Sequence, residues 1–235
     1  LEVLATGDND MFDYIVNYLT KMVGSRQKMR CAMVFYGKKG AGKDIIFENL
    51  FSLFYKGYFL KKSAKGVDTS FNSEFARMLF CLWAEIEITT ETVQKMKDMI
   101  TSKTMQEHAK GKDIMGAVDA FLSFVFSTNH QNEWAAKLNE NLNKDRRFKI
   151  IPVSERWAVD DDGDGNDERS AMFAYLMGVR DKADPGREAT AGEMEAVAIA
   201  LYSYFVKTYL EGVENGHWKR WNEENAFPRH ERDEF

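Results

Sequence analysis

A glycine-rich segment, Gly37-Lys38-Lys39-Gly40-Ala41-Gly42-Lys43, constrains this chain more than any other feature. It matches the pattern G-x-x-x-x-G-K, which carries meaning only between a strand and a helix. The apolar run from Cys31 to Tyr36 suits a strand buried on both faces, and apolar residues recur at helical spacing from Lys43 to Phe54. The chain is therefore predicted to turn tightly from a central strand into a helix at these glycines.

Such a turn is suited to binding phosphate. Its glycines let backbone N–H groups point inward around an anionic chain, and the helix N-terminus adds partial positive charge. Lys43 would reach the outer phosphates as a point charge, whereas the simple alternative is a glycine-rich turn with a solvated lysine. Asp44 stands where Ser or Thr would offer magnesium a hydroxyl, and a carboxylate there repels phosphate unless a metal bridges them or it turns away. We expect residues 37–44 to bind a nucleotide, with the metal role of Asp44 left open.

Strand and helix patterns alternate as far as residue 153, which predicts an α/β domain with a mostly parallel sheet flanked by helices. Beyond residue 168 only helical patterns remain, and Thr190 and Glu193 are spaced as a capping box at the start of the last one. The further predicted elements are helices over 11–23, 91–100, 169–182 and 192–210, and strands within 78–88, 121–127 and 148–153.

Composition narrows the class of protein. The 235 residues suffice for a proper core, and the longest apolar stretch, 196–206, is far too short to cross a membrane. Two cysteines, Cys31 and Cys81, indicate buried thiols in a reducing compartment. Because the chain begins at Leu1 without a leader segment, we expect a domain cut from a longer polypeptide, a proteolytic or tag-derived start being the alternative.

The net charge of −5 argues against a protein that coats nucleic acid with its whole surface. That acidity is local, because residues 155–168 hold seven acids and one Arg, and the remainder of the chain sums to +1. Residues 95–112 hold five Lys against two acids. A basic nucleic-acid site is therefore compatible with the overall charge, although a solvated helix face would show the same pattern.

Two carboxylates and an amide stand at expected strand ends. Glu85 and Glu87 would share one side of a strand, where one could hold magnesium through water and one could orient the attacking water. Two acids that merely face solvent are the alternative. Asn129 ends another strand and could hydrogen-bond a γ-phosphate or the attacking water, although Ser-Thr-Asn is also ordinary turn chemistry.

A pair of guanidinium groups, Arg146 and Arg147, precedes the last predicted strand. Arginine suits the stabilisation of transferring phosphate charge, often across a subunit boundary. A double Arg is also common in surface ion pairs. Both interpretations remain in place at the level of sequence.

Taken in order, these residues resemble superfamily 3 helicases, specifically the helicase domain of phage and plasmid primase-helicase or primase-polymerase proteins. The resemblance spans about residues 12–153. Its motifs are the phosphate loop at 37–43, the acidic strand at 82–87, a Lys-containing segment leading into a hairpin at 97–101 and 108–112, the sensor strand at 126–130 and the Arg-finger element at 145–148.

The resemblance implies an AAA+-like P-loop NTPase core that uses ATP and Mg²⁺. It also implies a homo-oligomeric ring, expected to be a hexamer, that translocates 3′ to 5′ on single-stranded DNA, with a primase or polymerase domain in the same polypeptide and a cytoplasmic location in a host cell. The implied roles are phosphate binding by Lys43, magnesium binding and water activation by Glu85 or Glu87, γ-phosphate sensing by Asn129, action in trans by Arg146 or Arg147, and a grip on DNA by Lys110 or Lys112 at the hairpin. Two departures are Asp44 and the acidic pair split by Ile86.

These observations divide the chain into an N-terminal helical segment (1–27), a P-loop ATPase core (28–154), an acidic loop (155–168) and a C-terminal helical region (169–235). The leading hypothesis is an ATP-driven helicase motor in the replication of a virus, phage or mobile element. Alternatives are a different P-loop enzyme, such as a kinase or packaging ATPase, and a degenerate module that oligomerises or loads other proteins.

Overall fold

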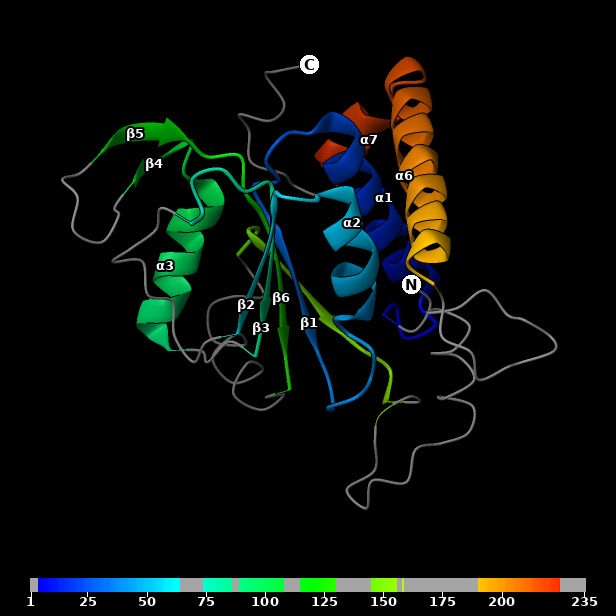
Figure 1. The fold of residues 1–235 in the computed structure, drawn as a ribbon, viewed down its shortest axis with the longest axis horizontal. Coiled ribbons are helices and arrows are strands. Elements are labelled where there is room, and N and C mark those ends of the chain that lie inside the picture. The colour runs from blue at the N-terminus through cyan, green and yellow to red at the C-terminus, as the bar shows by residue number, and fades with distance from the viewer. Residues whose placement is uncertain are drawn as a thin grey trace.

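A central sheet of five parallel strands lies between two layers of helices in the computed structural model (Figure 1). This arrangement confirms the α/β class predicted from the alternating patterns. The structure describes residues 4–63, 74–85, 89–107, 115–129, 145–155, 158 and 190–224. Within these ranges no helix combines the length and the hydropathy that crossing a bilayer requires.

The strand order in the sheet is β2-β3-β6-β1-β7, and every neighbouring pair is parallel. The strands are β1 (Ala32–Tyr36), β2 (Phe59–Ser63), β3 (Phe80–Ala84), β6 (Ser123–Thr128) and β7 (Phe148–Pro152). Strands β3 and β6 are buried along their whole length, because helices cover both faces of the sheet. The register pairs Tyr36 with Thr128 and Ala84 with Ser127, so β1, β3 and β6 end at nearly the same level.

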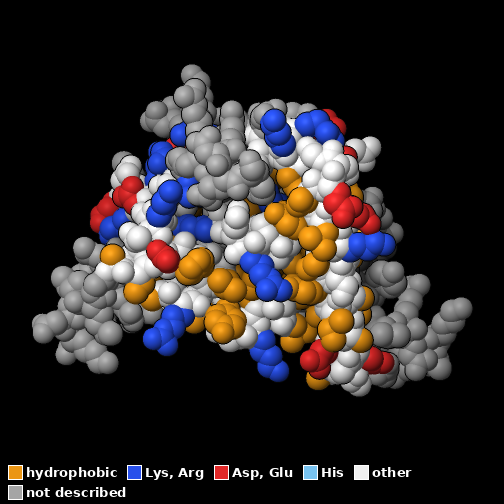
Figure 2. Space-filling view, turned by 90° about the horizontal axis from the view of Figure 1, so that it is seen from above, with side chains coloured by type: hydrophobic (Ala, Val, Ile, Leu, Met, Phe, Trp, Pro, Cys, Tyr) orange, Lys and Arg blue, Asp and Glu red, His pale blue; other side chains and the backbone are white. Residues whose placement is uncertain are grey.

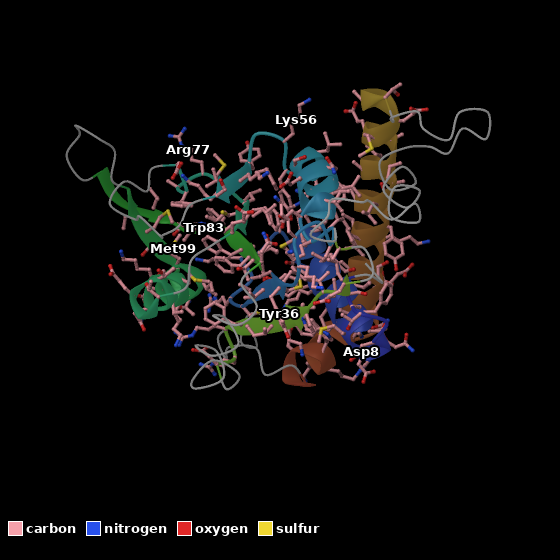
Figure 3. All side chains as sticks on the ribbon, turned by 90° about the horizontal axis from the view of Figure 1, so that it is seen from below. Asp8, Tyr36, Lys56, Arg77, Trp83 and Met99 are labelled. Atoms are coloured by element: carbon pink, nitrogen blue, oxygen red, sulfur yellow. The ribbon has the colours of Figure 1, made fainter. Side chains whose placement is uncertain are left out.

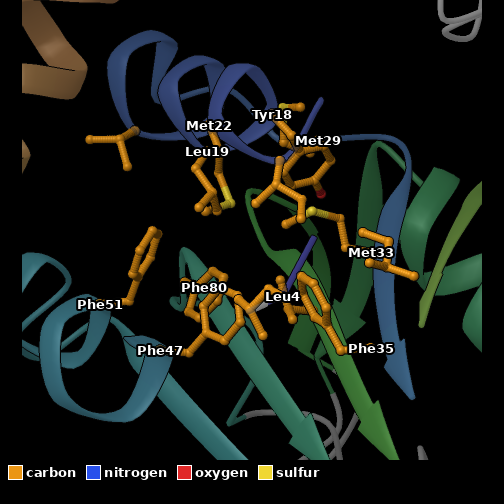
Figure 4. Packing of buried hydrophobic residues seen from close by; sticks show 14 of the residues in the cluster. Leu4, Tyr18, Leu19, Met22, Met29, Met33, Phe35, Phe47, Phe51 and Phe80 are labelled. Atoms are coloured by element: carbon orange, nitrogen blue, oxygen red, sulfur yellow. The ribbon is translucent and has the colours of Figure 1, made fainter. Parts of the chain in front are cut away.

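One face of the sheet is covered by α1 (Asn9–Ser25), η1 (Phe47–Phe51), α2 (Ser52–Phe54) and α6 (Ala191–Glu214). Helix α1 is capped by Asp8, whose carboxylate accepts a hydrogen bond from the Met11 amide. Its buried side chains, among them Leu19 and Met22, point toward the aromatic rings of Phe47 and Phe80 (Figure 4). Burial of this aromatic cluster anchors the helix that follows the phosphate loop.

The C-terminal helices pack on α1. The capping box at Thr190 and Glu193 is present, which confirms the predicted start of α6. Helices α1 and α6 approach each other closely at Gly24, near the C-terminal end of α1. A Cβ atom added to Gly24 would lie 2.2 Å from Tyr209 of α6, so only glycine fits there. Helix α7 (His217–Glu224) is held by a buried hydrogen bond of 2.6 Å from Lys21 to Asn222.

The opposite face is covered by α3 (Thr90–Thr101) and carries a small antiparallel hairpin, β4 (Thr104–Glu107) and β5 (Met115–Asp119). Met96 and Ile100 of α3 are buried in one cluster with Trp83 and Phe124. The hairpin starts directly after α3 and leads directly into β6. The turn of this hairpin, which includes Lys110 and Lys112, lies outside the described residues.

Several predicted boundaries shift in the structure. The helix expected from Lys43 becomes the five-residue π-helix η1 followed by α2, and the strand expected within 78–88 ends at Ala84. Strand β2 was not predicted, because Lys61 and Lys62 interrupt its apolar pattern; both lie at the sheet edge in ion pairs with Glu48 and Glu74. Helix α7 was also missed.

Other predictions divide between those confirmed and those outside the described residues. Cys31 and Cys81 are both buried, as expected, and neither takes part in a disulfide within the described residues. The helix expected over 169–182 lies outside the described residues, as does the acidic loop 155–168 apart from residues 155 and 158.

Candidate active site

The polar residues singled out at strand ends meet at the carboxyl edge of the sheet. Gly37 follows β1, Glu85 follows β3 and Asn129 follows β6. Because β6 lies between β1 and β3, Asn129 is placed between the phosphate loop and Glu85. Figure 3 looks onto this edge from below, with Tyr36 at the end of β1 between Met99 of α3 on one side and Asp8 of α1 on the other. The carboxyl edge of a parallel sheet is where such folds place their ligands.

The phosphate loop has the backbone geometry that its glycines permit. Gly40 and Gly42 have φ angles of 78° and 83°, which side chains with a Cβ rarely adopt. The Gly37 amide donates to the Thr128 carbonyl at 3.3 Å, which ties the loop to the end of β6. The Glu48 amide donates to the Asp44 carbonyl, so helical hydrogen bonding starts at the end of the loop. The loop therefore connects strand to helix as the motif requires.

Lys43 is the centre of the site. Its side chain is 5 % exposed, and its ammonium donates to the carbonyls of Gly37 (2.9 Å) and Lys38 (2.7 Å). The third hydrogen bond goes to Oδ1 of Asn129 at 2.7 Å. Burial lowers the pKa of Lys43, while the negative charges of Asp44 and Glu85 oppose that shift. Three acceptors and two nearby carboxylates thus stabilise a buried cation inside the loop.

Asn129 links that cation to an acid. While Oδ1 accepts from Lys43, Nδ2 donates to Oε1 of Glu85 at 3.2 Å. A carboxamide can accept from an ammonium through its oxygen and donate to a carboxylate through its nitrogen at once, whereas an ionised Asp offers acceptors only. The three residues form one hydrogen-bonded chain, Lys43–Asn129–Glu85, which we call the relay.

Glu85 reaches the relay by leaving the strand. Its φ of 53° is in the left-handed region, and its amide donates to the Ser127 carbonyl at 2.9 Å. Such a conformation costs a non-glycine residue about 1–2 kcal/mol. The expectation that alternation along a strand orients Glu85 was wrong, because the strand ends one residue earlier. Glu87 lies outside the described residues.

Asp44 is half-buried next to Lys43. Burial raises the pKa of its carboxyl group, and a hydrogen bond with Ser127 acts in the opposite direction. Its Oδ1 atom is buried and has no hydrogen-bond partner within the described parts of the chain. An oxygen in this state suits a hard cation such as Mg²⁺, so the donor set at this end of the loop fits the metal that the motif implies. Ser127 was not among the predicted site residues; a serine inside an apolar strand was its only sequence signal.

The two arginines directly precede β7, so they lie at the amino ends of the strands, opposite to the phosphate loop. Asp145 accepts two hydrogen bonds from the Arg147 guanidinium, both of 2.8 Å, and forms an ion pair with Lys97 at 2.9 Å. These partners outweigh burial and hold the pKa of Asp145 well below its usual range. Arg146 is exposed. The structure therefore engages Arg147 within the domain and leaves Arg146 facing outward.

Comparisons with known proteins agree with the fold. A family model described as a family of unknown function, DUF5906, matches residues 35–147. An apo structure of the NrS-1 C-terminal region (305–718) superposes with a TM-score of 0.59 at 16 % identity, covering 86 % of this chain and 50 % of that one. The A-form apo structure of the same region gives 0.55 at 18 % identity, with 86 % and 49 % covered. No curated protein matches the chain.

At these identities the solved structures show a shared fold. The chain spans about half the length of the structures it matches. Together, the fold and the site define an α/β domain in which a G-x-x-x-x-G-K loop follows a central strand of a parallel sheet.

Proposed function

We propose that this chain is an ATP-hydrolysing motor domain of the superfamily 3 helicase type, acting on single-stranded DNA as part of a ring. The observation that carries the proposal is the relay, because three residues that span 86 positions in sequence meet at the loop that would hold the phosphates. A structural turn has no need of a buried lysine bonded through an amide to an acid. In a phosphate-transfer site, a lysine can bind phosphate, an acid can hold the metal or orient water, and an amide can position both.

The residues divide the chemistry among them. Lys43 and the loop amides would bind the β- and γ-phosphates, and Asp44 together with Glu85 would hold Mg²⁺, which supplies charge neutralisation when bound. Glu85 would orient the attacking water and accept its proton as water bonds to the γ-phosphorus and the bond to ADP breaks. Asn129 would hold Glu85 in place and report on the γ-phosphate. Each of these groups lies at the carboxyl edge of the sheet.

The remaining parts of the proposal concern assembly. Arg146 lies at the edge of the sheet opposite to its own relay, so it could reach only the nucleotide of a neighbouring copy. This supports a ring, for which the sequence resemblance suggests a hexamer. We further propose that a primase or polymerase domain lies in the same polypeptide and that the protein acts in the cytosol of a cell that harbours a phage or mobile element.

A second candidate is a degenerate P-loop module that binds nucleotide without turnover and serves oligomerisation, loading or packaging. Asp44 specifically favours it, since a second carboxylate close to the phosphates adds repulsion wherever metal does not neutralise it.

Hydrolysis of ATP measured with and without single-stranded DNA tests the proposal. Lys43→Ala should reduce turnover by about 100-fold or more, because the charge that stabilises the transferred phosphoryl group is removed. The matched control is Lys207→Ala, which removes a lysine that is 79 % exposed on α6. Absence of turnover in the unmodified chain, with tight ATP binding, would replace the motor by the degenerate module.

A further inference from the structure

A hollow with a charged rim lies at the amino ends of the strands, opposite to the relay. It has a volume of about 220 Å³ and is bounded by the end of α1, the end of α3 and the base of the β4–β5 hairpin. Its charged lining consists of Arg26, Lys28, Arg30 and Lys103 against the single carboxylate of Asp119. Figure 2 looks onto the molecule from this side, and Lys and Arg side chains are spread across the face among hydrophobic ones. We call this hollow the basic pocket.

Three of the four cations that line the basic pocket have no ion pair within the described parts of the chain. Arg26, Lys28 and Lys103 form none with the described residues; Lys28 donates instead to the Met99 and Ser102 carbonyls at 2.7 and 2.8 Å. Burial, and secondarily the charge of Arg30, lowers the pKa of Lys28 to about 8. Lys28 and Arg30 are thus close enough to repel each other. An anion in the pocket would relieve that repulsion, so the charge pattern indicates a ligand rich in phosphate.

An aromatic ring stands beside these cations. Phe121 connects β5 to β6, lines the pocket and is 52 % exposed. Its backbone is held in place because the neighbouring Ala120 amide donates to the Lys103 carbonyl at 2.8 Å. The next residue along, Leu122, is buried in the core, so the chain directs one hydrophobic side chain inward and leaves this one outside. A rigidly mounted exposed ring next to several cations is the combination that binds unpaired bases and their phosphates.

We infer that the basic pocket binds single-stranded DNA, with Arg26, Lys28 and Lys103 contacting consecutive phosphates and Phe121 stacking on a base. Duplex DNA is less suited to the pocket because its bases offer no free face for the ring. The inference rests on the proposed function for the choice of DNA as the polynucleotide. The proposed DNA contact lies at the base of the β4–β5 hairpin, next to the C-terminal ends of α1 and α3.

The experiment measures binding of fluorescently labelled oligo-dT by anisotropy, without nucleotide, over a range of salt concentrations. Lys103→Glu should weaken binding about tenfold or more at low salt, and should reduce the salt slope by about 0.7 for the lost phosphate contact. Phe121→Ala should weaken binding about fivefold or more with an unchanged salt slope, and Phe121→Tyr should restore it. Lys207→Glu, with the same charge change on α6, should bind like the unmodified chain. Both test residues are exposed, and circular dichroism confirms that the variants fold.

Inorganic polyphosphate serves as a competitor that offers the charges without the bases. It should displace oligo-dT, and its affinity should fall in Lys103→Glu but not in Phe121→Ala. Oligo-dT binding that is unchanged in Lys103→Glu and Phe121→Ala would overturn the inference. So would loss of binding in Lys103→Glu alone with Phe121→Ala unaffected, which would reduce the pocket to a simple anion site. Because nucleotide is absent, these results are independent of whether the relay hydrolyses ATP.

Discussion

The positive side chains at the carboxyl ends of the strands are bonded differently from those at the amino ends. At the carboxyl edge, the Lys43 ammonium is buried and bonded to two carbonyls and to Asn129, with Glu85 completing the relay. At the amino edge, Arg26 and Lys103 are exposed beside Lys28, with Asp119 as the one acid lining the pocket. We propose that the first arrangement is organised in advance for chemistry on a small ligand. We propose that the second leaves its charge to be neutralised from outside, as binding and release of a long strand would require.

The largest loss of ATP turnover is expected from a change at Arg146. This residue lies at the amino ends of the strands but is proposed to act on the nucleotide of a neighbouring copy. Arg146→Ala should keep ATP affinity and lose turnover about 1,000-fold, the lower end of what a finger in trans contributes. Mixing it with a Lys43→Ala chain should restore partial activity, since each variant supplies what the other lacks. Reduced ATP affinity in Arg146→Ala, measured by equilibrium titration, would place this arginine in its own site instead.

A smaller loss is expected when the relay is cut in the middle. Asn129→Ala removes the amide between Lys43 and Glu85, and turnover should fall about 100-fold because Glu85 is no longer oriented. ATP binding and oligo-dT binding should change little. A variant that hydrolyses ATP at the unmodified rate would show that the relay is a packing feature without a catalytic role.

The pH dependence of DNA binding separates the edges further. Lys28 keeps its charge below a pKa of about 8 and loses it above, so its contribution to oligo-dT affinity should be present at pH 7 and fade by pH 9. Arg26, Arg30, Lys103 and Asp119 are the other charged groups that line the pocket. Affinity should drop several-fold, and Lys28→Arg should flatten the profile. A profile that is flat for the unmodified chain would exclude Lys28 from the contact.

Fold stability supplies the control for that experiment. The folded-state pKa of Lys28 lies below that of an ordinary lysine, so between about pH 8 and 10 the unfolded chain binds more protons than the folded one. The contribution of this group to stability therefore rises with pH over the same range. Weaker DNA binding there cannot result from unfolding at this residue, which thermal denaturation at both pH values will verify.

The smallest predicted effect concerns Arg147. Its bidentate contact with Asp145 is partly exposed, so Arg147→Ala should lower the free energy of unfolding by about 1 kcal/mol, measured by urea denaturation. Turnover per folded molecule should be retained. A loss of turnover matching that of Arg146→Ala would mean that Arg147 leaves Asp145 and acts as the finger.

Local patterns were sufficient to single out the three residues of the relay and to predict most of the sheet, but not the hydrogen bonds that join these residues. Lys43, Glu85 and Asn129 each follow an apolar strand, and parallel strands end at a common edge, so the meeting of these residues could be expected. What could not be expected was the detail at Glu85, because a single residue in the left-handed conformation has no marker in the sequence. Strand β2 was not predicted because Lys61 and Lys62 interrupt its apolar pattern. Two lysines can be accommodated there because β2 is the outermost strand of the sheet, where both form ion pairs.

The basic pocket was beyond prediction for a different reason. Lys28, Lys103 and Phe121 come from three separate segments, and each has an ordinary setting in its own segment. Only the packing of α1, α3 and the hairpin brings them to one hollow. The ion pair that engages Arg147 also depends on tertiary contact, since Lys97 reaches Asp145 from α3.

The most direct test measures ATP turnover and nucleotide-free oligo-dT binding in parallel for Lys43→Ala and Lys103→Glu. The account predicts that Lys43→Ala loses turnover and keeps DNA binding, whereas Lys103→Glu keeps turnover without DNA and loses DNA binding. Loss of both properties in either folded variant, or of neither in both, would contradict the separation of chemistry and strand binding between the two edges of the sheet.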